Sequence, residues 1–269
     1  MATAGYTARR YNRELREAMK PLEADLALHL YYDGVPNTPP VRFFLDRLCE
    51  VVEDAKAEGG TGQLWITEHA RVPNGFWSKT PKSMWPETAN LAAAIGLADM
   101  LVAGAQIPEV LGAFTHSLVG SGSPWPMFHT RSDGQIEPSA TLLAMQTLRQ
   151  TMKPLVVATT QTSQGRGSQD ALYTVRSAVL ASDDRRSFTL WSVNRSNQSQ
   201  PLAFQIANAP PSLQIAGSHR IGNPDAGVGN HLPGVPVRIE SGVHEVTATG
   251  PGAWRILLPP NSINALLFR

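Results

Sequence analysis

Cysteine is almost absent from this 269-residue chain, and charge is sparse and balanced. Cys49 is the only cysteine, which excludes an intrachain disulfide and a cysteine-based metal site. The 23 basic and 22 acidic residues give a net charge of +1 and form no basic cluster, so we expect no nucleic-acid partner. The spacing of His219, His231 and His244 does not fit metal ligands, and we expect neither a metal nor a cofactor.

Long hydrophobic runs are also missing. Residues 1–10 contain no apolar segment of the kind that a signal peptide requires. The longest apolar stretch, residues 91–107, is interrupted by Asp99 and Gln106 and predicts a buried helix instead of a membrane span. We therefore expect a cytoplasmic protein that does not enter the membrane, although a chain cut from a longer precursor would have lost its signal.

The first 150 residues alternate between helical and strand patterns. Apolar residues at helical spacing predict helices around residues 11–22, 43–55, 87–105 and 138–152, and short apolar runs predict strands at 26–31, 63–67 and 111–116. The pattern contains three strand-loop-helix units preceded by one extra helix. Strands that alternate with helices indicate a parallel sheet covered by helices.

The pattern changes after Pro154. Helical periodicity disappears, and short runs of alternating polarity are separated by Gly, Pro, Asn, Asp and Ser. About seven such runs predict an all-β antiparallel sandwich. We place the domain boundary near residues 153–158, which gives a first domain at 1–153 and a second at 154–269.

The segment from Gln63 to His69 carries the strongest functional signal. A short β-rich run delivers Glu68 and His69 at its expected C-terminal end, where the catalytic side chains of barrels of parallel strands and helices lie. A loop rich in Gly, Pro and Trp follows. The flat faces of sugars stack on aromatic rings, so a carboxylate near Trp77, Trp85 and Trp125 indicates a carbohydrate site. The plainer interpretation is that Glu68 ends a strand beside a solvated loop.

All three predicted strands end in residues whose side chains can take part in binding or catalysis. The first ends with His29 and Tyr31, the second with Glu68 and His69, and the third with His116, followed by Trp125 in the next loop. Parallel strands bring their C-terminal ends to one edge of the sheet. This convergence supports a shared site more strongly than any one motif.

Three motifs taken in order resemble the C-terminal half of glycoside hydrolases of clan A, closest to the family 51 α-L-arabinofuranosidases. They are His29-Leu30-Tyr31-Tyr32-Asp33-Gly34, Trp65-Ile66-Thr67-Glu68-His69 and Phe114-Thr115-His116-Ser117-Leu118-Val119. The ending Leu257-Leu258-Pro259-Pro260-Asn261-Ser262 resembles the Leu-Pro-Pro-x-Ser ending of that family.

The resemblance implies part of an eight-stranded (β/α) barrel, about its last three strand-helix units, followed by a β-sandwich. It implies a retaining glycosidase that removes terminal arabinofuranosyl residues from arabinose-containing oligosaccharides. Glu68 carries over as the nucleophile, and His29, Tyr31 and His116 carry over as residues of the sugar pocket. His69, Trp77 and Trp125 join them as substrate-binding candidates, with His69 either orienting Glu68 or simply ending the strand.

One departure from the family pattern is chemically important. The acid/base of these enzymes lies in an Asn-Glu pair, and no such dipeptide occurs in this sequence. A retaining glycosidase needs two carboxyl groups about 5–5.5 Å apart, so we expect the chain to carry the nucleophile half of a site. Two alternatives remain open: a non-catalytic carbohydrate-binding or interaction module, and a truncated reading frame without independent function.

An incomplete barrel would also leave exposed edges. The segment before His29 is short, which indicates either a deleted strand or a fusion of two pieces. Side chains expected to face the barrel interior, namely Leu28, Trp65 and Phe114, would lose partners. We therefore expect self-association, pairing with a complementary N-terminal half, or aggregation.

Overall fold

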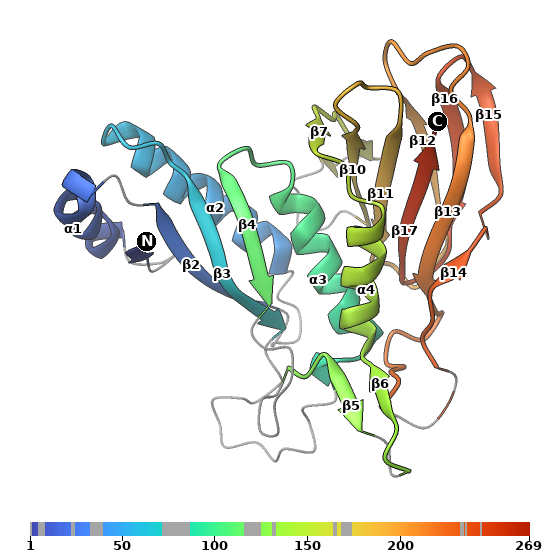
Figure 1. The fold of residues 1–269 in the computed structure, drawn as a ribbon, viewed down its shortest axis with the longest axis horizontal. Helices are drawn as coiled ribbons and strands as arrows, with labels where there is room; N and C mark the ends of the chain where they lie inside the picture. Colours follow the sequence, from blue (N-terminus) through green and yellow to red (C-terminus); the bar gives the residue numbers. More distant parts are fainter. Residues whose placement is uncertain are drawn as a thin grey trace.

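The computed structural model of the chain describes most of the sequence (Figure 1). The described residues are 2–4, 9–22, 25–32, 40–71, 87–115, 125–130, 133–163, 166–167, 174–231, 234, 236–242 and 244–269. Among the helices of these ranges, none is both long and apolar enough to span a membrane.

A four-stranded parallel sheet forms the first part of the molecule. Its strands follow one another in chain order, and three helices make the crossovers between them, as parallel pairing requires. The strands are β1 (Ala2–Ala4), β2 (Leu26–Tyr32), β3 (Leu64–Arg71) and β4 (Val110–Thr115). The crossovers are α1 (Arg9–Met19) with a 3₁₀ turn (Lys20–Leu22), α2 (Pro40–Ala57) and α3 (Leu91–Gly104).

The expected count of three parallel strands is wrong by one. Strand β1 precedes α1 and pairs in parallel with β2 through the register Ala2 to Leu26. The helix that we expected to stand alone is therefore an ordinary crossover. The sequence does not predict β1, because its three small residues, Ala2–Ala4, show no apolar periodicity. These four strands form an open sheet, and their identity as part of a barrel remains a prediction.

The two faces of the parallel sheet have different environments. Alternate residues of β2 and β3 point to α2 and α3 and form one apolar core, which includes Leu28, Leu30, Leu64, Ile66 and Val51. The opposite face carries His29, Trp65 and Phe114 and is more open to solvent. Leu28 is fully buried against the helices, so our expectation that it faces the other side is wrong.

The chain then crosses to the second part of the molecule. An antiparallel hairpin of β5 (Phe128–Thr130) and β6 (Ile136–Pro138) follows β4 and leads into α4 (Ala140–Gln150). Ser139 is the N-cap of α4, because its side chain accepts a hydrogen bond from the backbone N–H of Leu142. The hairpin is an addition to the expected helices and parallel strands.

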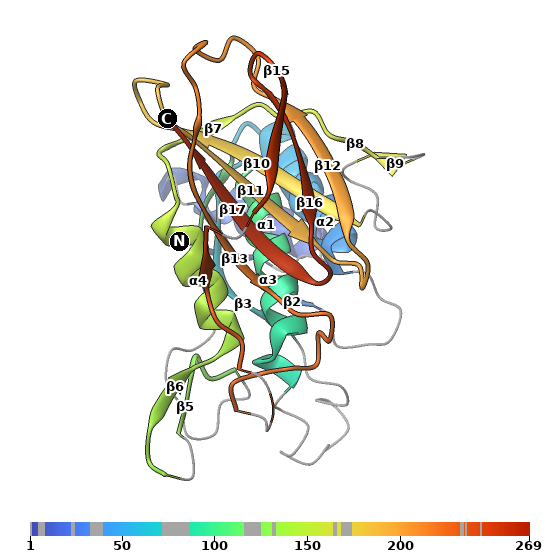
Figure 2. The same ribbon diagram turned by 90° about the vertical axis from the view of Figure 1, so that its right-hand side faces the viewer.

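Almost everything after α4 is antiparallel strand, as the sequence predicts (Figure 2). Six strands form one sheet in the order β14-β13-β17-β11-β10-β7, and three form another in the order β12-β16-β15. The larger sheet contains β7 (Leu155–Val157), β10 (Val175–Ala181), β11 (Phe188–Asn194), β13 (Ile215–Gly222), β14 (Glu240–Ser241) and β17 (Ser262–Phe268). The smaller contains β12 (Gln200–Gln205), β15 (Val246–Gly250) and β16 (Ala253–Leu258), and β8 (Thr162–Ser163) pairs with β9 (Arg166–Gly167).

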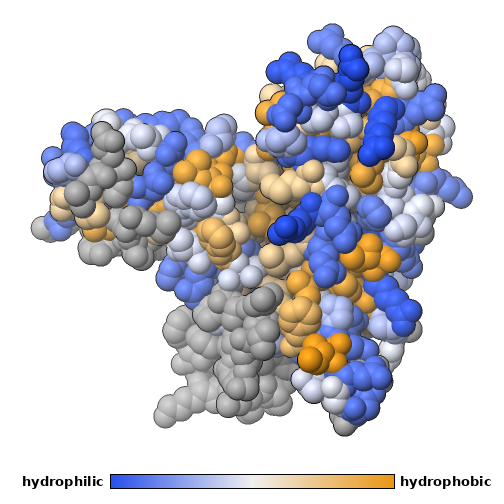
Figure 3. All heavy atoms as spheres, in the orientation of Figure 1, coloured by the Kyte–Doolittle hydropathy of each residue, from blue (hydrophilic) through white to orange (hydrophobic). Residues whose placement is uncertain are grey.

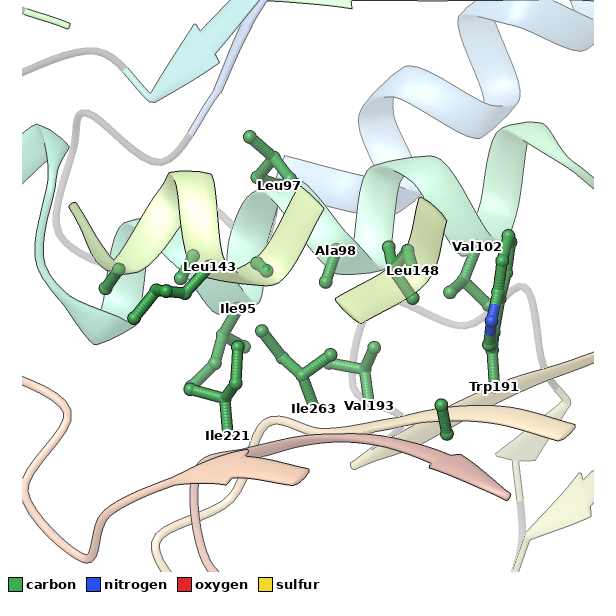
Figure 4. Close-up of a cluster of buried hydrophobic side chains, with 14 of the residues drawn as sticks. Ile95, Leu97, Ala98, Val102, Leu143, Leu148, Trp191, Val193, Ile221 and Ile263 are labelled. Atoms are coloured by element: carbon green, nitrogen blue, oxygen red, sulfur yellow. The ribbon is translucent and has the colours of Figure 1, made fainter. Parts of the chain in front are cut away.

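The larger sheet is covered on both faces. One face packs on the smaller sheet around Trp254 and Phe268, and the other packs on α3 and α4 (Figure 4). Trp191, Val193, Ile221 and Ile263 meet residues of α3 and α4 in that second core. Burial on both sides explains why β11 is buried along its whole length. Because this core crosses the expected boundary near residue 153, the division into two domains stays a prediction.

A buried ion-pair group lies where α3 meets the larger sheet. Asp99 is completely buried on α3, and its carboxylate accepts from Arg176 Nε at 2.7 Å and lies 3.0 Å from Arg195 Nη1. Arg176 lies on β10, and Arg195 directly follows β11. One carboxylate thus joins the helix to two segments of the sandwich.

We expect Asp99→Asn to lower the free energy of unfolding by about 3–5 kcal/mol, because it removes the charged partner of the buried Arg176 and the partly buried Arg195. Chemical denaturation followed by circular dichroism measures the change. Asp183→Asn, on the exposed hairpin after β10, is the matched control and should change stability by less than about 0.5 kcal/mol. Equal stability of the two variants would contradict a structural role for the buried pair.

Candidate functional site

An irregularity in β3 determines which face Glu68 occupies. Leu28 pairs with Ile66, but the next residue, His29, pairs with Glu68, so Thr67 is an extra residue in β3. Successive side chains of a strand point to opposite faces, and one extra residue therefore reverses every side chain that follows. Without the bulge, Glu68 would face the helices. With it, Glu68 shares the open face with His29 and Trp65.

His29 and Glu68 are in direct contact. The Nδ1 atom of His29 lies 3.1 Å from Oε2 of Glu68, and the side chains are 46% and 23% exposed. They lie on adjacent parallel strands, and the carboxylate is three residues before the end of β3. The strand runs on to Arg71, so Glu68 precedes the strand end at which we expected it.

Aromatic and basic groups surround the end of β3. The rings of Tyr31 and Trp125 are tilted against each other with centroids 5.3 Å apart. Trp125 is buried, and its Nε1–H donates to the backbone carbonyl of Arg71. The Arg71 guanidinium donates to the carbonyl of Glu87 at 3.3 Å and to Asn90 Oδ1 at 3.5 Å, just before α3. These contacts fix the loop residue Trp125 beside the strand ends.

His69 lies on the opposite side of the sheet from Glu68. Its ring is almost fully buried, and its Nδ1 is 3.3 Å from the hydroxyl of Tyr32, which makes Tyr32 its neighbour in place of Glu68. Burial lowers the pKa of His69 to about 3, so the ring is neutral near pH 7. The two side chains line a small cavity of about 10 Å³ together with Trp125, Thr115 and Thr141. That volume is close to the least that holds one water.

The open face has an aromatic surface next to the His29–Glu68 pair. Trp65 stacks on Phe114 with ring centroids 6.0 Å apart, and its Nε1–H donates to Asp25 Oδ2 at 2.9 Å. A Cβ atom on Gly112 would lie 2.8 Å from the Trp65 ring, so this position needs glycine. Phe114 is 52% exposed, which agrees with the expectation that Trp65 and Phe114 lie on the face away from the helices.

The structure brings some of the expected site residues together. His29 contacts Glu68, and Tyr31 contacts Trp125, whereas His69 is turned into the core. Trp77, Trp85 and His116 lie outside the described residues. Among the described residues no group of three or more His, Cys, Asp or Glu side chains could hold a metal.

Sequence reasoning missed Tyr32, Arg71 and the bulge at Thr67. Our predicted strands end before Tyr32 and Arg71. In the structure, β2 runs to Tyr32, and β3 continues through Ala70 to Arg71. The bulge has no clear sequence signal, because Thr67 is an ordinary strand residue. An interpretation that keeps strict alternation places Glu68 on the wrong face.

The likeness of this chain to known proteins comes from solved structures. No protein-family model and no curated protein matches the sequence. The α-L-arabinofuranosidase of Thermotoga maritima, solved in complex with arabinose, superposes with a TM-score of 0.73 at 16% identity over 99% of this chain and 56% of that chain. AbfB, a family 51 α-L-arabinofuranosidase from Bifidobacterium longum, gives 0.72 at 14% identity over 97% and 57%. The family 51 enzyme of Xanthomonas axonopodis pv. citri gives 0.70 at 12% identity over 100% and 57%.

This likeness establishes a shared fold. The present chain spans little more than half of each of these structures, which is consistent with the expected correspondence to their C-terminal half. The substrates and activities of these enzymes are properties of those proteins, and they apply to this chain only as a proposal.

The neutral, buried state of His69 predicts a specific response to acid. Below its unfolded pKa of 6.5 the ring takes up a proton only in the unfolded chain, until the pH approaches 3. Unfolding therefore becomes easier as the pH falls, by about 3 kcal/mol between pH 6.5 and 4. We expect His69→Gln to remove this part of the acid dependence in urea unfolding curves measured at each pH.

His219→Gln is the matched control, because His219 lies on β13 and bonds Ser241 at 3.0 Å, away from the cavity. The stability difference between wild type and His69→Gln should be constant above pH 7 and shrink towards acid. If the free energy of unfolding of wild type and of His69→Gln changed with pH in parallel, His69 would not be buried in its neutral form.

Proposed function

We propose that the chain carries the nucleophile side of a retaining glycoside hydrolase that removes terminal arabinofuranosyl residues from arabinose-containing oligosaccharides. The observation that carries the proposal is the contact between His29 and Glu68 on the open face of the parallel sheet, near the strand ends. The glycoside hydrolases that share the fold support the reaction class, and the residue motifs support Glu68 as the nucleophile.

In this proposal the Glu68 carboxylate attacks the anomeric carbon and forms a glycosyl ester, while the leaving group departs from the other side. His29 orients the carboxylate through Nδ1, 3.1 Å from Oε2. Tyr31, partly buried beside Trp125, supplies a hydroxyl and an aromatic edge at the rim of the sugar site.

The reaction also needs a second carboxyl group that protonates the leaving oxygen. General acid catalysis of this kind contributes roughly 10²- to 10⁴-fold to the rate. The sequence contains no Asn-Glu pair that resembles the acid/base of family 51. We therefore propose that this carboxyl comes from a complementary part, either covalently continuous with this chain or separate, that completes the site.

The missing Asn-Glu pair also favours a second candidate function. A module that keeps the sugar-binding wall and the sandwich without the acid would bind arabinose-containing oligosaccharides without cleaving them. Binding that survives in Glu68→Gln, together with no turnover of any arabinoside by the wild type, would favour this non-catalytic function.

The nucleophile assignment predicts activity on activated substrates only. Dinitrophenolate leaves without protonation, so the purified chain should hydrolyse dinitrophenyl α-L-arabinofuranoside slowly and natural arabinosides very weakly. Glu68→Gln should lower the rate on the activated substrate by at least about 10²-fold, because the attacking group is lost. Release of dinitrophenolate, followed by absorbance, measures both rates.

Glu53→Gln, on the exposed side of α2, is the matched control and should leave the rate unchanged. Equal rates for Glu68→Gln and wild type would refute the nucleophile assignment. Rapid turnover of a natural arabinoside by the isolated chain would refute the missing acid and reveal another carboxyl in this sequence.

The open sheet predicts self-association. Strand β4 is an edge of the parallel sheet in the described part of the chain, and Leu111 and Phe114 on it are 42% and 52% exposed. An exposed edge with apolar side chains pairs readily with other strands. Size-exclusion chromatography with light scattering should detect dimers or larger species at micromolar concentration.

Phe114→Lys should shift this equilibrium towards the monomer, because a charge on the sheet face opposes stacking. Ile136→Lys, on the exposed hairpin strand β6, is the matched control and should not shift it. A wild-type protein that is monomeric at all concentrations would contradict the prediction.

A further inference from the structure

Three side chains lie in one row across the open face of the parallel sheet. His29 of β2 pairs with Glu68 of β3, and on the other side of β3 the pairing with β4 leaves Phe114 opposite the bulge. The stacking of Phe114 on Trp65 places its ring on the same face. Neighbouring strands lie about 4.8 Å apart, so His29 and Phe114 flank the Glu68 carboxylate on its two sides.

The Phe114 ring rests on a tryptophan whose position is fixed. Trp65 lies one row nearer the start of β3, and its ring is nearly parallel to that of Phe114, with an interplanar angle of 21°. Its Nε1–H donates to Asp25 Oδ2 at 2.9 Å, and its six-membered ring lies over Gly112, where a side chain would not fit. Phe114 is 52% exposed although Trp65 supports it. A ring that is fixed beforehand loses little conformational freedom when a ligand covers it.

An occupant of this row must suit two kinds of surface at once. Covering the exposed Phe114 ring is favourable, whereas burying the neighbouring Glu68 carboxylate without hydrogen bonds is costly. A wholly apolar partner would satisfy only the ring, and a small ion would satisfy only the polar His29–Glu68 pair. A sugar ring offers both surfaces in one small molecule, because its C–H groups can lie on the aromatic ring while its hydroxyls bond to the polar pair.

We propose that Phe114, supported by Trp65, is the surface on which the sugar ring attacked by Glu68 stacks, and that it selects cyclic sugars over open-chain polyols. The identity of the sugar, an arabinofuranoside, rests on the proposed function, whereas the place of Phe114 beside the carboxylate rests on the strand register. Phe114 makes or breaks no bond in this proposal. Because it would hold the sugar alike in the ground state and the transition state, it should act on KM more than on kcat.

Saturation-transfer nuclear magnetic resonance on the purified chain tests the proposal, with methyl α-L-arabinofuranoside and the open-chain polyol arabinitol as probes. The glycoside should bind at least about fivefold more tightly than arabinitol. Phe114→Leu, which stays apolar but loses the ring, should weaken glycoside binding by about fivefold, and Phe114→Tyr should bind like the wild type. Phe128→Leu, at another exposed phenylalanine on β5, is the matched control and should bind like the wild type.

Turnover separates this proposal from the nucleophile assignment. On dinitrophenyl α-L-arabinofuranoside, Phe114→Leu should raise KM by about fivefold and change kcat by less than about twofold, whereas Glu68→Gln should lose kcat. A wild type that binds the methyl glycoside without turning over the activated substrate would refute the nucleophile assignment alone. The binding measurements would then still decide the role of Phe114.

Four results would overturn the role of Phe114: no binding of the glycoside by the wild type, equal binding of arabinitol, undiminished binding in Phe114→Leu, or an equal loss in Phe114→Tyr. The first of these would leave self-association as the use of this aromatic face. If Phe114→Leu does not fold, judged by circular dichroism, the comparison of glycoside with arabinitol on the wild type and on Phe114→Tyr decides.

Discussion

Helix α3 is the element on which both halves of the structure depend. Twelve of its 14 residues are buried, because Met100 faces the parallel sheet while Ala98 and Val102 face the six-stranded sheet. A helix that is apolar on every side needs partners on every side. Its one buried acid, Asp99, must then find counter-charges inside the protein, and it finds them in Arg176 and Arg195. Most of the surrounding contacts are apolar and permit sliding, whereas this ionic contact fixes the position of α3 relative to the sandwich.

The position of α3 has consequences for the site. Its N-terminal turn is held from the sandwich side by the carbonyls of Ala226 and Val228 and from the strand side by Asn90 and Arg71. Arg71 ends the strand that carries Glu68, and Trp125 is bonded to its carbonyl. The ends of β3 and the start of α3 are thus parts of one hydrogen-bonded group. In Figure 3, a hollow separates the lobe with α1 and α2 from the sandwich lobe, and α3 contributes to the apolar cores of both.

The sequence predicts the architecture better than the site. Alternating apolar patterns predict the change from helix and parallel strand to antiparallel strand, because burial on one face leaves a regular period. Strand β1 is lost, because Ala2–Ala4 is too short and too small to show any period. That His29 and Glu68 lie near the same edge of the sheet is predictable, because parallel strands align their ends, but their shared face depends on the bulge at Thr67. The burial of His69 is not predictable either, since it depends on the bulge at Thr67, and a bulge is decided by pairing with β2 and β4.

The open face that exposes Glu68 also constrains any chemistry there. Charges in water interact weakly, and groups that stabilise a transition state act far more strongly where water is excluded. The His29–Glu68 pair is partly exposed, and the aromatic surface of Trp65 and Phe114 lies beside it on the same face. Whatever covers the aromatic surface would also remove water from the carboxylate. Association and catalysis would then depend on one surface. A partner that only bound Trp65 and Phe114 would strengthen the electrostatic interactions of the Glu68 carboxylate. A partner that also brought a carboxyl group within about 5–5.5 Å of Glu68 would complete a retaining site.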